Sequence, residues 1–252
     1  MTILRSLLFN VLFYLTLVVL FLAGIVLLPV AHATAVKAMQ GLCRLLLWEL
    51  RVVAGTAMAV RGLEHVPKGP LLVAGKHQSL WETFALLTLF DDPAMVLKKE
   101  LTLIPVFGWY IRKLRMIAVE RSAGSAALRG LVARAREERA AGRQIIIMPE
   151  GTRRAPDDPP DYKPGAAALY AALDVPCVPF GLNAGLFWPR RRFLRHPGVI
   201  VVEFLPAIPP GLPRRDFQAR LEQAIETSTR NLVAEGRSTW QPPEPKKQNG
   251  NN

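Results

Sequence analysis

The N-terminal segment constrains the fold most strongly, because it is too apolar to lie exposed to water. No Asp, Glu, Lys or Arg occurs between Arg5 and Lys37, and the apolar run between them exceeds the roughly 20 residues that cross a bilayer as a helix. A signal peptide is the alternative, since Ala31-His32-Ala33 fits the small-x-small cleavage pattern. The run is longer than a usual h-region of about 7 to 15 residues, which favours a retained membrane helix.

Residues 35–54 predict a second helix, which is basic on one side. Lys37, Arg44 and Arg51 are seven residues apart and share one helical stripe, and such amphipathic helices bind at the headgroup boundary. A surface helix packed on the domain core would show the same pattern. We favour the membrane interpretation because an apolar helix directly precedes this one. Residues 1–54 are therefore predicted to be membrane-anchoring helices, forming either a re-entrant hairpin or a true span.

The charge of the chain indicates the kind of partner it binds. The net charge is +12 over 252 residues, which favours nucleic acid, anionic lipid headgroups or phosphorylated substrates. Beside a membrane segment, lipid and phosphate are the better interpretation, and we expect no nucleic acid partner. Cys43 and Cys177 have neither metal-ligand nor disulfide-framework spacing, which is typical of a reducing compartment.

From residue 55 onward, strand and helix signals alternate. Strand signals are "PLLVAG", "AMVLKK", "MIAVER", "QIIIMPE", "VPCVPFGL" and "VIVVEFL", with helical segments between most of them and a last helix from about 214 to 235. This alternation predicts an α/β fold with a mixed, largely parallel sheet covered by helices. The tail 239–252 contains "QPPEPKKQNGNN", which has no apolar residues to bury, and is predicted to be disordered.

The stretch "KHQSLWET", residues 76–83, allows two interpretations. Within one helix, His77 and Glu82 would be separated by about 140° and could not touch. If the helix begins between them, the preceding loop can fold His77 back toward Glu82 and form a catalytic pair at the carboxyl end of a strand. Alternatively, Ser79 is a helix N-cap and Glu82, three residues later, completes a capping box.

A second polar segment, "MPEGTRR", follows another strand signal. Gly151 allows close approach of the backbone to a ligand, and the guanidinium of Arg153 can bind a phosphate through two hydrogen bonds. Glu150 and Thr152 complete the polar group. A plain polar loop would have a similar composition.

Together these segments resemble the 1-acylglycerol-3-phosphate acyltransferases, within the glycerolipid acyltransferase family. That family carries a His-x4-Asp/Glu box, a Lys-Glu-Leu segment with downstream Pro and Gly and a later Arg, a Pro-Glu-Gly-Thr-Arg box and a Val-Pro-x-x-Pro strand. The matching segments here are His77 to Glu82, "KKELTLIPVFGW" with Lys99 followed by Arg121, Pro149 to Arg153, and "VPCVP". Their order and spacing agree over roughly residues 70–185. Glu82 departs from the commoner Asp, and a Glu precedes Arg121.

The resemblance implies an acyltransferase domain over 55–238 that works in phospholipid synthesis. It would move a fatty acyl chain from acyl-CoA or acyl-carrier protein to the 2-hydroxyl of lysophosphatidate, giving phosphatidate. His77 would be the general base, with Glu82 holding its other nitrogen. The phosphate-binding residues would be Arg153, Lys99, Arg121, Glu150, Gly151 and Thr152. The substrate hydroxyl is the nucleophile, so no enzyme serine, metal or cofactor is expected.

Two alternative functions remain open in the sequence. One is acyl transfer to another lysolipid, such as a lyso-ornithine lipid or a lysophospholipid. The other is a non-catalytic, membrane-anchored protein that binds anionic lipid or nucleic acid, which would need the arginines but not the His77–Glu82 pair. The run "WPRRRF", residues 188–193, suits a membrane interface better than nucleic acid. We expect the protein at the inner membrane of the cell, with its catalytic domain on the cytoplasmic face.

Overall fold

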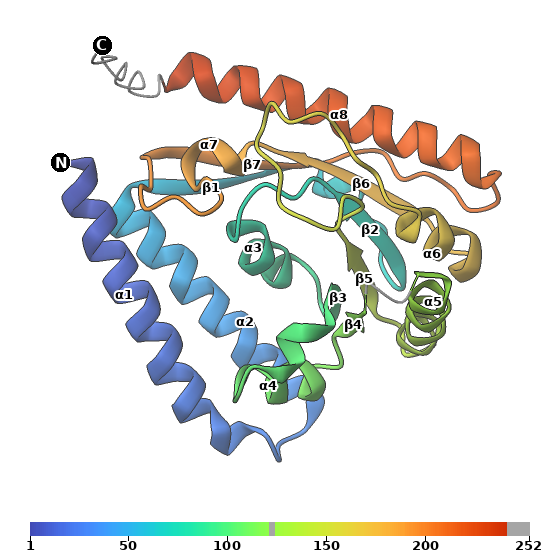
Figure 1. Ribbon diagram of the computed structural model, residues 1–252, viewed down its shortest axis with the longest axis horizontal. Coiled ribbons are helices and arrows are strands. Elements are labelled where there is room, and N and C mark those ends of the chain that lie inside the picture. The colour runs from blue at the N-terminus through green and yellow to red at the C-terminus, as the bar shows by residue number, and fades with distance from the viewer. Residues whose placement is uncertain (121–123, 241–252) are drawn as a thin grey trace, which may run out of the picture.

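The computed structural model describes residues 1–120 and 124–240. Its centre is a seven-stranded sheet in the order β1-β7-β6-β2-β5-β3-β4 (Figure 1). Only β6 and β7 pair antiparallel within this sheet, and the other neighbouring strands are parallel. The strands are β1 (Thr56–Arg61), β2 (Leu71–Gly75), β3 (Pro93–Lys98), β4 (Ile117–Val119), β5 (Gln144–Ile147), β6 (Cys177–Leu182) and β7 (Gly198–Phe204). The predicted mixed, largely parallel sheet is confirmed.

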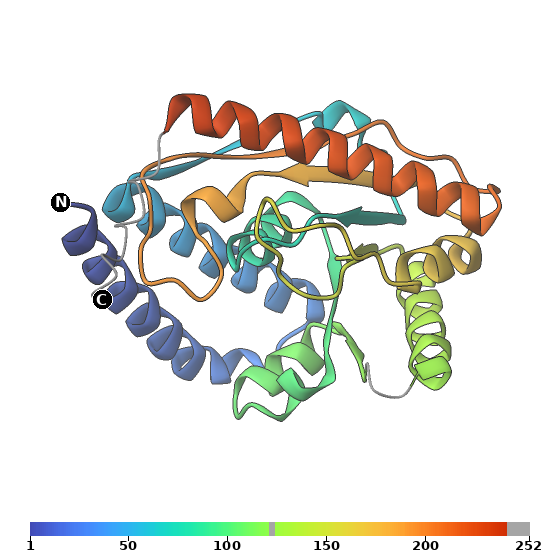
Figure 2. The same ribbon diagram turned by 45° about the horizontal axis from the view of Figure 1, so that its top comes forward.

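Helices cover both faces of the sheet. They are α1 (Thr2–Ala23), α2 (His32–Glu49), α3 (Trp81–Leu89), α4 (Phe107–Lys113), α5 (Gly124–Ala140), α6 (Gly165–Leu173), α7 (Ala184–Phe187) and α8 (Arg214–Thr239). Figures 1 and 2 show α8 along one face, while α1 and α2 lie on the other side with α3. A hydrophobic core lies on each face of the sheet, and β2 contributes side chains to both. Leu71 and Val73 belong to the core beneath α1–α3, whereas Leu72 and Ala74 belong to the core beneath α5, α6 and α8.

Helix α1 is packed along one side and exposed along the other. On its inner side, Phe13 contacts Phe84 of α3 and Trp188, with ring centroids 5.7 and 5.4 Å apart. Its outer side exposes Ile3, Leu4, Leu7, Leu8, Val11, Tyr14, Leu15, Val18, Val19 and Leu22. The helical segment Thr2–Val26 is long and apolar enough to cross a membrane. A water-soluble domain rarely exposes so continuous an apolar surface.

Helix α2 connects α1 to the first strand of the sheet. The predicted helix over 35–54 begins earlier, at His32, and continues through a π-helical turn over Leu50–Ala54. Gly55 ends it with a left-handed φ of 78°, a conformation that favours glycine. The predicted basic stripe of Lys37, Arg44 and Arg51 is exposed, as expected. Because the other side of α2 packs on α3, α2 is both a core helix and the bearer of an exposed basic stripe.

The C-terminal helix is longer than the sequence predicts. It continues to Thr239, and the next residue, Trp240, packs against Phe187 and His196 with ring centroids 5.6 and 4.6 Å away. The first two residues of the predicted disordered tail are thus placed on the folded domain. Residues 241–252, to which the rest of that prediction refers, lie outside the described residues.

Candidate active site

Three loops meet at one edge of the sheet, because β6, β2 and β5 are adjacent parallel strands that end there. The loop after β2 carries His77, and the loop after β5 carries the Pro-Glu-Gly-Thr-Arg box. The backbone N–H of Arg154 donates to the His77 carbonyl at 2.8 Å. The N–H of Gly185, beyond β6, donates to the Gln78 side chain at 2.9 Å. This edge is where open α/β sheets carry their ligands.

The predicted contact between His77 and Glu82 is present. Helix α3 begins at Trp81, so the two residues do not share a helix, and the loop folds His77 back as expected. Its Nδ1 lies 2.8 Å from Glu82 Oε1. The Glu82 side chain is fully buried, whereas that of His77 is 17% exposed, so the imidazole can reach a substrate.

Glu82 also anchors the start of α3, as the alternative interpretation expected, although the N-cap is Leu80 and not the predicted Ser79. Its Oε1 accepts hydrogen bonds from the backbone N–H groups of Gln78 and Ser79 at 2.6 and 2.7 Å. Ser79 Oγ in turn accepts from the N–H of Trp81 at 3.2 Å. The two interpretations therefore hold together, because one carboxylate oxygen anchors the helix start and the histidine at once.

This arrangement prepares the second ring nitrogen of His77, Nε2, to accept a proton. A carboxylate accepts only, so the proton of a neutral imidazole lies on Nδ1 and the free lone pair lies on Nε2. Glu82 would also stabilise the imidazolium that forms when Nε2 takes a proton. A histidine held in this way can act as a general base near neutral pH.

Glu150 has a different environment from the one predicted. Its Oε1 accepts from Lys76 Nζ at 3.0 Å, and the same Nζ donates to Glu226 Oε1 at 2.7 Å. Tyr162 donates to that Glu226 oxygen at 2.9 Å. Burial raises the pKa of Glu150, and the hydrogen bond from Lys76 acts against this. Since Glu150 is buried with Lys76, we correct its predicted place among the phosphate-binding residues and assign it to the support of the loop.

Sequence reasoning missed Lys76, although a signal for it was present. Lys76 directly follows the fully buried strand β2 and precedes His77. A lysine that continues a buried strand is itself buried and requires a carboxylate partner. Its partners could not be identified from sequence spacing, because Glu226 lies on α8, 150 positions away.

Arg153, which the sequence predicted as a phosphate-binding residue, lies near Glu82. Its side chain is half-buried, and burial lowers its pKa, while the nearby Glu82 carboxylate raises it and Arg190 lowers it. Among residues 1–120 and 124–240, no carboxylate lies within ion-pair distance of its guanidinium. Arg154, by contrast, pairs with Asp161 at 2.5 Å. Arg153 is thus available to an anionic ligand.

The other predicted phosphate-binding residues that the structure describes form no hydrogen bond or ion pair with the His77–Glu82 pair. Gly151 adopts a left-handed φ of 66°, and Thr152 is exposed. Lys99 is exposed at the end of β3, where Glu120 Oε2 lies 2.6 Å from its Nζ and raises its pKa. In the described part of the chain, no contact joins Lys99 to His77, Glu82 or Arg153. Arg121 lies outside the described residues.

An apolar cavity of about 520 Å³ extends from α3 toward the outer helices. Leu80 and Thr83, which flank Glu82 closely in sequence, line its wall together with Phe84. The remaining wall comes from α1, α2, β3 and α4, including Phe21 and Met39. Its size is within the range of small-molecule sites, and its nearly uniform apolar lining suits a hydrocarbon chain.

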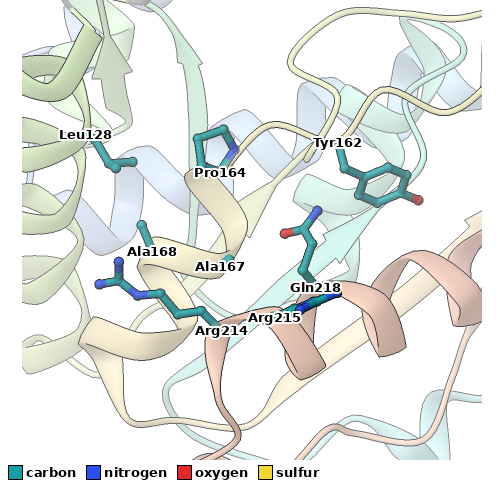
Figure 3. Close-up of a pocket in the computed structure, with 8 residues that line it drawn as sticks. All are labelled: Leu128, Tyr162, Pro164, Ala167, Ala168, Arg214, Arg215 and Gln218. Atoms are coloured by element: carbon teal, nitrogen blue, oxygen red, sulfur yellow. The ribbon is translucent and has the colours of Figure 1, made fainter.

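A second cavity, of about 370 Å³, lies between α5, α6 and the start of α8 (Figure 3). Its lining residues are Leu128, Tyr162, Pro164, Ala167, Ala168, Arg214, Arg215 and Gln218. None of these is a predicted site residue. Tyr162 connects this cavity to the buried Lys76 cluster through Glu226.

The sequence is similar to that of known acyltransferases. A family model described as Acyltransferase matches residues 57–183, which is half of the chain. The 1-acyl-sn-glycerol-3-phosphate acyltransferase of Pseudomonas aeruginosa is 38% identical over 196 residues, covering 78% of this chain and 76% of that protein. The lyso-ornithine lipid O-acyltransferase of the same organism is 27% identical and covers 71% and 75%.

More distant proteins share the fold or part of the sequence. The crystal structure of the lysophosphatidate acyltransferase PlsC from Thermotoga maritima superposes with a TM-score of 0.76 at 24% identity, covering 93% of this chain and 98% of that one. This likeness supports the fold. The chloroplastic acyltransferase BAT2 of Brassica napus is 29% identical, and the match covers 57% of this chain and 43% of that longer protein.

Proposed function

Because the chain belongs to the acyltransferase family, we propose that it moves a fatty acyl chain from acyl-CoA or acyl-carrier protein to the 2-hydroxyl of 1-acylglycerol-3-phosphate, giving phosphatidate. The observation that carries the proposal is the His77–Glu82 pair, which lies near the unpaired Arg153 and is followed in α3 by residues that line the apolar cavity. The fatty acyl chains of the substrates require an apolar cavity, and the phosphate of the acceptor requires a cationic side chain. A binding protein would not require the histidine and carboxylate.

The reaction can be followed atom by atom. His77 Nε2 takes the proton of the acceptor hydroxyl as its oxygen attacks the thioester carbonyl, which forms a tetrahedral intermediate. Glu82 stabilises the imidazolium from the Nδ1 side. When the intermediate collapses, the carbon–sulfur bond breaks and the imidazolium returns its proton to the departing thiolate. The products are phosphatidate and the free thiol of the donor, and His77 is regenerated.

The acceptor assignment depends on Arg153. The phosphate monoester of lysophosphatidate carries between one and two negative charges near neutral pH, whereas a lyso-ornithine lipid has no phosphate. An unpaired, half-buried guanidinium favours the phosphate. The purified protein should therefore convert labelled lysophosphatidate to phosphatidate in preference to acylating a lyso-ornithine lipid.

Arg153→Lys should raise the KM for lysophosphatidate by about 10- to 150-fold. Lysine keeps the charge but loses the planar fork, and one hydrogen bond to a charged group contributes about 1.5 to 3 kcal/mol. The KM for the acyl donor should change far less, as initial-rate kinetics with each substrate varied in turn would reveal. If only the donor KM rose, Arg153 would bind acyl-CoA instead. If neither changed, it would be a structural loop residue.

We further propose that the outer side of α1 docks the enzyme on the membrane, at the cytoplasmic face of the inner membrane. Support comes from the exposed apolar side of Thr2–Val26 and from Leu103, Ile104 and Trp109, which are also exposed. Trp109 belongs to α4, which contacts α1 because Tyr110 donates to the Phe21 carbonyl at 2.7 Å. Leu103 belongs to the turn Lys99–Leu103, which packs on α4. A continuous apolar surface of this kind would leave water on insertion into the acyl region.

Leu8→Ser combined with Leu15→Ser should weaken binding to phospholipid vesicles by more than tenfold. Each leucine that leaves water contributes about 1.5 to 3 kcal/mol, and both side chains are exposed, so the fold should be retained. Cosedimentation with vesicles measures the effect. Leu63→Ser is a matched control, since Leu63 is 49% exposed but lies far along the chain from α1. Unchanged vesicle binding in the double variant would contradict docking through α1.

A further inference from the structure

We propose that Arg190 is a second guanidinium ligand for the phosphate of the lipid acceptor, alongside Arg153. Arg190 belongs to a loop over residues 189–195, called here the arginine loop, which follows α7 beyond the end of β6. This inference rests on the proposed function and adds a residue to its acceptor site. The sequence alone suggested only a membrane-facing role for this run.

The first observation is a direct contact between the two arginines. Arg190 Nη1 donates to the backbone carbonyl of Arg153 at 2.6 Å. The positive charge of Arg190 also lowers the pKa of Arg153, after the larger effect of burial. A single hydrogen bond uses one of the five N–H donors of Arg190, so four remain for a ligand beside Arg153.

The second observation is that neither side chain forms an ion pair among the described residues, although the Glu82 carboxylate is near enough to Arg153 to raise its pKa. In the described ranges 1–120 and 124–240, neither guanidinium has a carboxylate within ion-pair distance, although Arg61 pairs with Glu235 and Arg237 with Asp157 in the same molecule. Two neighbouring like charges repel each other. A phosphate between them would remove this repulsion and could accept hydrogen bonds from both.

The third observation is that the arginine loop is held in place from within. Arg195 is buried, and its Nη1 donates to the carbonyls of Arg192, Phe193 and Leu194 at 2.7 to 3.1 Å. Its guanidinium also lies over the ring of Trp188, 4.7 Å from the centroid. Burial lowers the pKa of Arg195 to about 10, so it remains a cation near neutral pH.

Helix α1 fixes the same loop with two of its polar side chains, Ser6 and Asn10. Ser6 Oγ accepts from the Arg195 N–H at 2.9 Å, and Asn10 Nδ2 donates to the Phe193 carbonyl at 3.0 Å. The loop also contains Arg191 with a left-handed φ of 55°, a strained conformation for a residue other than glycine. Such restraint is expected of a loop that must present Arg190 at one position.

The phosphate could come from the acceptor or from a bilayer headgroup, since the chemistry is the same. The test therefore measures binding of lysophosphatidate in detergent micelles by calorimetry, with full-length protein and no acyl donor. Arg190→Gln should raise the Kd by about 10- to 150-fold, the loss of one hydrogen bond to a charged group. Arg192→Gln is the matched control, because Arg192 is exposed on the same loop and should stay within threefold of the wild type.

The outcomes separate this inference from the proposed function. An unchanged Kd in Arg190→Gln, or an equal rise in both variants, would overturn the role of Arg190. Loss of binding to anionic vesicles, with the micelle Kd unchanged, would also overturn it and assign the loop to bilayer headgroups. If the wild type bound lysophosphatidate but did not acylate it, the proposed reaction would fail while the Kd comparison still tested Arg190. No binding by the wild type would overturn both.

Discussion

His77→Ala should lower the turnover of lysophosphatidate by about 10² to 10⁴. This is the usual contribution of a general base, and His77 is the histidine that a buried carboxylate orients at 2.8 Å. The Kd for lysophosphatidate should stay close to that of the wild type, because the phosphate ligands are elsewhere. Initial rates and calorimetry on one preparation measure both quantities.

The fold should tolerate this change. Glu82 keeps its two hydrogen bonds from the backbone of Gln78 and Ser79, so the start of α3 remains anchored. The Tm should therefore differ little from that of the wild type. His65→Ala, in the short helical turn Leu63–His65 after β1, is the control and should keep full activity. Near-normal turnover in His77→Ala would exclude the histidine as the base.

Glu82→Gln should also reduce turnover severely, by about 10² or more. The amide oxygen can still accept the backbone hydrogen bonds of the capping box, but it carries no charge to stabilise the imidazolium. This substitution therefore separates the two functions that Glu82 Oε1 combines. The readout is kcat for lysophosphatidate.

A thermal melt provides the control for Glu82→Gln. The new amide nitrogen would occupy the position of Oε2, which is buried without a hydrogen-bond partner among the described residues. An unsatisfied buried donor costs about 1 to 3 kcal/mol, which lowers the Tm by several degrees in a domain of this size. Full activity in a variant that melts only slightly lower would mean that Glu82 is simply a helix cap.

The sequence could predict the His77–Glu82 pair because the geometry is local. Both residues and the start of α3 lie within one short stretch, and the angular separation on a helix limited the possible arrangements. The sequence placed the two polar loops after separate strand signals, but it did not predict that Arg153 would lie beside this pair. The structure shows that relation, because β2 and β5 are parallel neighbours that end at the same edge. The largely parallel sheet itself followed from the alternation of strand and helix signals.

Contacts between distant segments could not be predicted in this way. Lys76 meets Glu226 across 150 positions, and Arg190 meets the Arg153 carbonyl across 37. No periodicity or spacing encodes such pairs. Glu150 was therefore assigned to a phosphate, because the lysine that binds it could not be recognised as its partner.

The N-terminal helix shows the same limit of local patterns. Its apolar composition predicted membrane docking and gave no reason for Ser6 and Asn10. The structure supplies that reason, because both residues hold the arginine loop. Phe9 and Phe13 belong to the same core cluster as residues of β2 and α3. One side of α1 therefore supports the domain, and the opposite side would contact the bilayer. Deleting the helix would therefore disturb the site as well as membrane binding, which is why exposed leucines are the better test of docking.

The central claim is that the protein acylates a lipid phosphate monoester, and an acceptor comparison tests it most directly. Purified full-length protein would receive equal amounts of labelled lysophosphatidate and lyso-ornithine lipid, with acyl-CoA or acyl-carrier protein as donor, in detergent micelles. The expected result is phosphatidate as the main product, formed at least tenfold faster than acylated ornithine lipid, since one hydrogen bond to a charged group contributes about 1.5 to 3 kcal/mol. Faster acylation of the lyso-ornithine lipid, or no acylation of lysophosphatidate with either donor, would contradict the account.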